Sequence, residues 1–174
     1  MKSYKHFLWL AVTLCLAVGL FSSSVADAHG NVAVSLTAPK RVTEGSTFAA
    51  SVDIRRVVDL HAANYDIIFD PNIVEVTDVT NGLIAGTTMP VDIWIEITPG
   101  TIRLISVLPD LSSVSGSGYL AKIQFHVIGS AGSMSYLRLS SGVLSNTSAN
   151  EILATWAQTS VRIHKTVTAP HNPA

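Results

Sequence analysis

The sequence contains almost no cysteine: one residue among 174, Cys15, near the N-terminus. Leu14 precedes it, where a bacterial lipoprotein signal has a small residue, so we expect no lipidation of Cys15. The chain beyond this segment has no thiol and therefore no disulfide. A domain formed by that part must be held together by its hydrophobic core alone.

Charge is also scarce, because Asp, Glu, Lys and Arg make up 13% of the residues. The 11 basic and 12 acidic residues give a formal net charge of −1, and both signs are spread along the chain. No basic stripe is present, which argues against nucleic acid as a partner. We also find no internal repeat and no sustained helical periodicity.

The N-terminus has the pattern of a targeting segment. Two lysines lie among the first five residues, residues 7–21 are apolar, and small residues follow up to Ala28. This pattern predicts a secretory signal peptide over residues 1–28, cleaved after Ala28 or Ala26. Retention as a membrane anchor is the alternative, but the apolar run is short for a span. We therefore expect a secreted, extracellular protein with no membrane span after cleavage.

The remainder suits one domain, which we place at residues 29–165. Residues 166–174 hold two prolines and no apolar period, which predicts a flexible C-terminal tail. Valine, isoleucine, threonine and serine dominate the domain, and turn signals recur at short intervals, which is typical of an all-β sandwich or barrel. The nine predicted strands are residues 32–38, 47–54, 62–69, 73–79, 91–98, 101–108, 118–127, 135–143 and 155–164.

Side-chain alternation predicts the face on which each strand residue lies. In residues 91–98 the three isoleucines are assigned to the core, so their neighbours, Trp94 among them, face outward. In residues 101–108, Ile102 and Leu104 are assigned to the core. The predicted outward residues, which form the candidate partner-binding site, are Asn64, Asp66, Ile68, Asp92, Trp94, Glu96, Arg103 and Ile105.

An exposed tryptophan is typical of an interface hot spot, and it also stacks on sugar rings. The alternative is that a loop or the terminal tail covers Trp94. Together with Val107, the predicted outward aliphatic residues form an apolar patch with a polar rim, which is the composition of a protein-binding face.

Catalysis is not predicted. A glycosidase needs two carboxyl groups flanking a cleft, whereas Asp92 and Glu96 are spaced along one flat strand. Asp70 is interpreted as a turn-capping residue before Pro71. The histidines form no His-x-His or His-Glu-x-x-His pattern, so we expect no metal ligand and no cofactor on this chain.

Two segments together carry a family resemblance. Residues 63–76 read ANYDIIFDPNIVEV and residues 114–125 read VSGSGYLAKIQF, each a strand joined to a sharp turn. In this order and spacing they resemble the cohesin modules of bacterial cellulosomes, and the likeness extends over about residues 32–163.

The resemblance implies a nine-stranded β-sandwich with jelly-roll topology. Cohesins bind dockerins, which are small calcium-loaded helical modules, and the calcium belongs to the dockerin. The binding face is built mainly from the strands that match residues 62–69, 91–98, 101–108 and 135–143. By this resemblance the chain is not an enzyme.

The predicted function is therefore a secreted cohesin-like module that docks a dockerin-bearing protein, in the assembly of extracellular polysaccharide-degrading proteins. The alternative is a carbohydrate-binding module that recognises polysaccharide on the same face. Few aromatic residues are available as a sugar platform, since they make up 7% of the chain, and this favours the protein partner. A third interpretation is an adhesion or cell-surface module without a dockerin.

Overall fold

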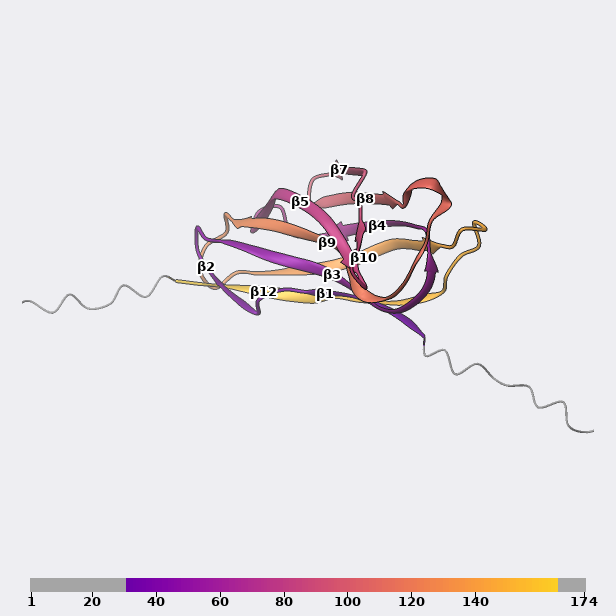
Figure 1. The fold of residues 1–174 in the computed structure, drawn as a ribbon. Helices are drawn as coiled ribbons and strands as arrows, with labels where there is room; N and C mark the ends of the chain where they lie inside the picture. Colours follow the sequence, from indigo (N-terminus) through magenta and orange to yellow (C-terminus); the bar gives the residue numbers. More distant parts are fainter. Residues whose placement is uncertain (1–30, 166–174) are drawn as a thin grey trace, which may run out of the picture.

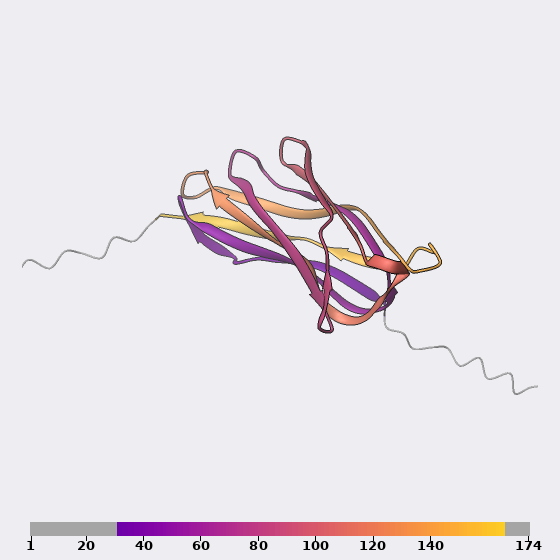
Figure 2. The same cartoon turned by 45° about the horizontal axis from the view of Figure 1, so that its top comes forward.

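The computed structural model describes residues 31–165, which form two β-sheets packed face to face (Figure 1). The described chain begins at one end of the sandwich and finishes at the other, as both views show (Figures 1 and 2). The predicted signal peptide and the predicted C-terminal tail lie outside the described residues. No described helix is long and apolar enough to cross a membrane.

Each sheet has six strands. In spatial order, the first contains β11 (Ala154–Ala157), β1 (Val32–Thr37), β3 (Thr47–Leu60), β9 (Val114–Val127), β5 (Val74–Ile84) and β6 (Thr87–Met89). The second contains β2 (Arg41–Thr43), β12 (Thr159–His164), β10 (Met134–Ser145), β4 (Ala62–Ile68), β8 (Thr101–Val107) and β7 (Ile93–Thr98). One short 3₁₀ turn, η1 (Pro109–Leu111), connects β8 to β9.

The all-β sandwich is confirmed, but the chain is divided more finely than the sequence predicted. Within the described residues, eight of the nine predicted strands are present as single strands, the ninth is divided in two, and the total is twelve. Two of the additional strands, β2 and β6, have three residues each and lie at sheet edges. The third additional strand arises because the last predicted strand is divided into two. β11 pairs with β1 in the first sheet, and β12 pairs with β10 in the second.

The core lies between the sheets and follows the alternation of side chains. Val52, Ile54, Ile123 and Phe125 from the first sheet are fully buried, as are Ile67, Leu104 and Leu137 from the second. Phe125 stacks on Phe48 with ring centroids 5.3 Å apart and meets Phe69 edge-on at 5.5 Å. Such aromatic contacts add to the stabilisation from burial alone, and no disulfide is needed.

The turn after β4 is built as predicted. Asp70 Oδ1 accepts a hydrogen bond from the Asn72 backbone N–H at 2.9 Å, and the Asp70 carbonyl accepts from the N–H groups of Ile73 and Val74. The β7–β8 turn packs on this corner through Gly100, whose φ is +79°. A Cβ at Gly100 would lie 2.5 Å from the Phe69 carbonyl oxygen, so the corner requires glycine here.

Trp156 of β11 packs inward against the core. It pairs with the buried Val34, and its ring centroid lies 6.3 Å from that of Tyr65. It rests on Gly142, where β10 bulges between Ser140 and Val143, and a Cβ at Gly142 would overlap the indole. Trp156 therefore closes the end of the core near β10.

Candidate functional site

Four adjacent strands of the second sheet, β10, β4, β8 and β7, turn one side away from the core. We call this side the outer face. Residues that oppose each other in antiparallel strands lie on the same side of the sheet, so the register defines its rows. One row across the four strands consists of Ser140, Asp66, Arg103 and Ile95. The neighbouring row consists of Val143, Asn64, Ile105 and Ile93.

An ion pair occupies the first row. Arg103 Nε donates to Asp66 Oδ1 at 2.7 Å, and Arg103 Nη2 donates to Asp66 Oδ2 at 2.9 Å. This two-pronged geometry is the strongest form of the arginine–carboxylate contact. Asp66 is only 5% exposed, although it points away from the core. The hydrogen bond from Arg103 to Asp66, together with the carboxylate's charge, raises the pKa of Arg103. The opposite charges of Asp66 and Arg103 therefore neutralise each other.

Aliphatic side chains surround this pair. Ile93 and Ile95 are 50% and 54% exposed, and the other large exposed members of the face are Ile68, Val107 and Val143. Ile105 lies between them, half-buried. The aliphatic residues of β7 and β8 adjoin one another, whereas Asn64 separates Val143 from Ile105. Grouped exposed aliphatic residues beside a neutralised charge pair are typical of protein-interaction surfaces.

The predicted orientation of β7 is wrong. Trp94 opposes Leu104, which in turn opposes Tyr65, and both of these are fully buried. Trp94 therefore lies on the inner side of the sheet, while Ile93 and Ile95 lie on the outer face. The reason is that β7 is an edge strand where the sandwich opens, so neither of its sides is fully covered, and all six of its residues are exposed.

Trp94 and Glu96 face a cavity of about 290 Å³ between β7 and β5. Val74 and Val76 of β5 form part of its wall, and Phe69 and Ile102 also line it. Glu96 Oε1 accepts a hydrogen bond from the Gly100 N–H at 3.0 Å, so this carboxylate stabilises the β7–β8 turn. Trp94 fills the open edge of the sandwich and is 42% exposed there.

The fold and this face can be compared with known proteins. The model of the cohesin domain family matches residues 32–163 of the sequence. The chain belongs to the cohesin family. As a cohesin domain it is a non-catalytic, protein-binding module. No curated protein matches the sequence.

Solved cohesin structures have the same fold. The non-cellulosomal cohesin of Archaeoglobus fulgidus is 20% identical, with 76% of this chain and 91% of that chain covered and a TM-score of 0.63. The cohesin module of a family 33 glycoside hydrolase from Clostridium perfringens is 16% identical, with 78% and 98% covered and a TM-score of 0.68. A type I cohesin–dockerin complex from Clostridium thermocellum matches at 16% identity, with 77% and 95% covered and a TM-score of 0.64.

Of the eight predicted site residues of this cohesin, the structure brings five together on the outer face: Asn64, Asp66, Ile68, Arg103 and Ile105. Asp92 lies beside β8, where its Oδ2 accepts from the Val107 N–H at 2.7 Å and its own N–H donates to the Ile105 carbonyl. Its carboxylate therefore has a structural bond at the rim of the face. Trp94 and Glu96 are not part of the outer face.

Three prominent members of the outer face, Ile93, Ile95 and Val143, were not predicted from the sequence. The pattern Ile-x-Ile-x-Ile in β7 was assigned to the core, but the same pattern fits an apolar outer face on an edge strand. Val143 follows the β10 bulge, which shifts the register, so alternation from the start of the strand fails to place it.

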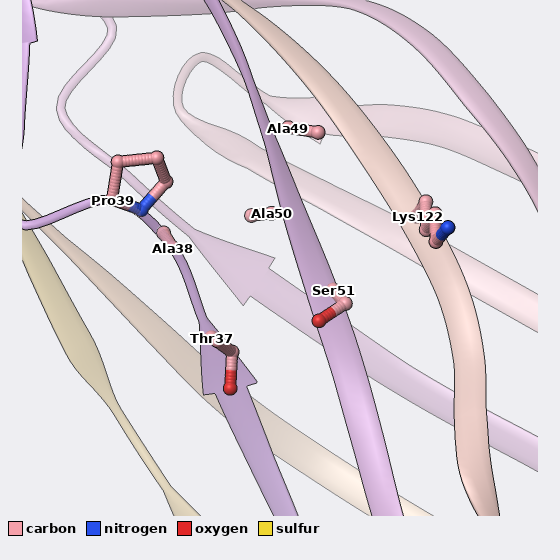
Figure 3. Close-up of a pocket in the computed structure, with 7 residues that line it drawn as sticks. All are labelled: Thr37, Ala38, Pro39, Ala49, Ala50, Ser51 and Lys122. Atoms are coloured by element: carbon pink, nitrogen blue, oxygen red, sulfur yellow. The ribbon is translucent and has the colours of Figure 1, made fainter.

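The other sheet carries a shallow depression of about 390 Å³ across β1, β3 and β9 (Figure 3). Thr37, Ala38 and Pro39 lie on one side of it, with Ala49, Ala50 and Ser51 along β3 and Lys122 on β9 (Figure 3). The Lys122 ammonium lies 4.6 Å from the centroid of the Tyr119 ring. No carboxylate, histidine or cysteine lines this depression. Within residues 31–165, no three His, Cys, Asp or Glu side chains gather closely enough to hold a metal ion.

Proposed function

We propose that this cohesin is secreted and binds a calcium-loaded dockerin through the outer face of β10, β4, β8 and β7. The observation that carries the proposal is the group of exposed aliphatic side chains beside the Asp66–Arg103 pair on these strands. The cohesin–dockerin complexes among the similar structures support this class of partner. The jelly-roll topology implied by the resemblance remains a prediction.

The biological setting in this proposal is the assembly of secreted proteins that degrade polysaccharide. It rests on the predicted signal peptide and on the family. Direct polysaccharide binding on the same face has less support, because Tyr136 is the one aromatic side chain among the described outer-side residues of this sheet. Sugar platforms need several coplanar rings, because each ring stacks on a separate sugar.

The first experiment is capture of a partner. The chain from His29 onward is immobilised, and the secreted proteins of the source organism are passed over it with calcium and eluted with a chelator. We expect the eluate to contain proteins with duplicated calcium-binding loops. An eluate without them would overturn dockerin binding, and depletion of the cohesin by insoluble polysaccharide would then favour the carbohydrate alternative.

A pair of variants locates the interface. Ile105→Gln removes an apolar group from the centre of the outer face, and Thr80→Gln introduces the same side chain at an exposed position on the other sheet. We expect Ile105→Gln to weaken capture at least about tenfold, as for a central hot spot. Thr80→Gln should have no effect. Equal effects of the two variants would argue against the outer face.

A further inference from the structure

One edge of the second sheet is unprotected. The four edge strands of the two sheets are β11, β6, β2 and β7, and β7 is the longest, with six residues against three or four in the others. Alternate backbone N–H and C=O groups of an edge strand point away from the sheet and can pair with another strand. Figure 1 draws β7 at the outermost margin of its sheet.

Proteins usually block such edges with lysine, proline, strong bulges or very short strands. β7 contains no lysine, arginine or proline, and Glu96, its one charged residue, turns to the inner side and binds the Gly100 N–H. The ladder with β8 is regular from Ile93 to Glu96, and it shifts only before Thr98. The strand is therefore regular from Ile93 to Glu96, largely apolar, and without a neighbouring strand on one side.

The sequence of β7 also fits its own copy. Residues 93–97 read IWIEI, in which the isoleucines lie symmetrically about Ile95, while Trp94 and Glu96 take each other's place when the segment is read backwards. If two copies pair antiparallel with a two-fold axis at Ile95, that residue opposes its own counterpart and Ile93 opposes Ile97 of the second copy. Ile93 and Ile95 lie on the outer face, and Ile97 lies at the register shift before Thr98. β-branched cross-strand pairs stabilise a sheet. On the inner side, Trp94 opposes Glu96 of the second copy.

We propose that two copies of this chain associate by antiparallel pairing of their β7 strands about a two-fold axis at Ile95. The contact is isologous, so it closes as a dimer and does not propagate into a fibre. It joins the two outer faces into one continuous surface. The proposal does not depend on dockerin binding, because the association is measured without any partner.

The association is tested first by sedimentation of the chain from His29 onward across a wide concentration range. We expect the mass to rise from that of the monomer to twice that value. Ile95→Lys places two like charges opposite each other at the axis and should leave a monomer. Val143→Lys places the same charge on the outer face but on the interior strand β10, and it should still dimerise. The reverse result would indicate face-to-face stacking and overturn the proposal.

A covalent test fixes the register. The chain from His29 onward has no cysteine, so Ile95→Cys introduces a single thiol. Opposed residues in antiparallel strands have Cα atoms about 4.5–5.5 Å apart, within the range of a disulfide. Two copies of Ile105→Cys would be three strand spacings apart, about 14 Å, which is too far. We expect oxidation to cross-link Ile95→Cys alone. Absence of this cross-link, or equal cross-linking of both variants, would overturn the pairing.

Discussion

Replacement of Trp94 by alanine tests which side of β7 supports the fold and which side meets a partner. Because Trp94 lies on the inner side and covers the open edge of the sandwich, its loss should cost stability and leave the outer face intact. The alternation in the sequence alone predicts the opposite: an intact fold and weaker partner capture.

The size of the effect follows from the exposure of Trp94. With 42% of its surface exposed, somewhat more than half is in contact with the protein. A large aromatic side chain of about 250 Å² then buries roughly 140 Å². At about 25 cal/mol per Å² this burial contributes about 3.5 kcal/mol. This value is an upper bound, because a compact unfolded chain already buries part of the side chain. We therefore expect a loss of about 2 kcal/mol, with Tm lower by roughly 8 °C.

The assay is urea unfolding of Trp94→Ala and of Ile95→Ala, its neighbour on the other side of the strand. Ile95 is 54% exposed, so Ile95→Ala should change the free energy of unfolding by less than about 1 kcal/mol. In the capture experiment the order should reverse, with Ile95→Ala the weaker binder. If Trp94→Ala is as stable as the parent and loses the partner, Trp94 belongs to the docking side and the reasoning from register is refuted.

Three further predictions concern the buried Tyr65 and the corner after β4. The Tyr65 hydroxyl is buried without a hydrogen-bond partner among the described residues. Tyr65→Phe should therefore raise the free energy of unfolding, measured in urea, by about 1 kcal/mol. A lower free energy of unfolding would mean that an interior water forms a hydrogen bond with the hydroxyl. Burial also raises the pKa of Tyr65, so the folded chain keeps a proton that the unfolded chain releases. The stability of the parent relative to Tyr65→Phe should hold below about pH 10 and fall above it. Gly100→Ala, at φ +79° and against the Phe69 carbonyl, should cost at least about 2 kcal/mol, and an unchanged Tm would contradict the close approach.

Alternation placed the residues of the interior strands β4 and β8 correctly, because one side of each is buried and the other is not. In β4, Tyr65 and Ile67 face the core while Asn64 and Ile68 face out, as predicted. The same reasoning failed on β7, where both sides are exposed and the apolar alternation serves the outer face. The sequence does not show which strand lies at the edge of the sheet. Alternation of apolar and polar residues has a physical basis only where one side of the strand is buried and the other is exposed.

The burial of Asp66 could not be predicted either. Its carboxylate is covered by Arg103, which lies 37 residues away in the sequence and comes beside it only through the β4–β8 register. Alternation gave the correct side of the sheet for both residues. The exposure of Asp66 depends on a long side chain from the next strand, and no local pattern reports such a contact.

The self-neutralised pair also constrains what the outer face can bind. Asp66 and Arg103 satisfy each other in two hydrogen bonds, so a partner that covers them needs to supply no charge of its own. A partner that places a lysine or a carboxylate over the row of Ser140, Asp66, Arg103 and Ile95 would bury that charge without a free counter-ion. Such a burial costs several kcal/mol, which is more than a surface ion pair returns. If the outer face is the docking site, as we propose, it selects an apolar partner surface partly by excluding charged ones.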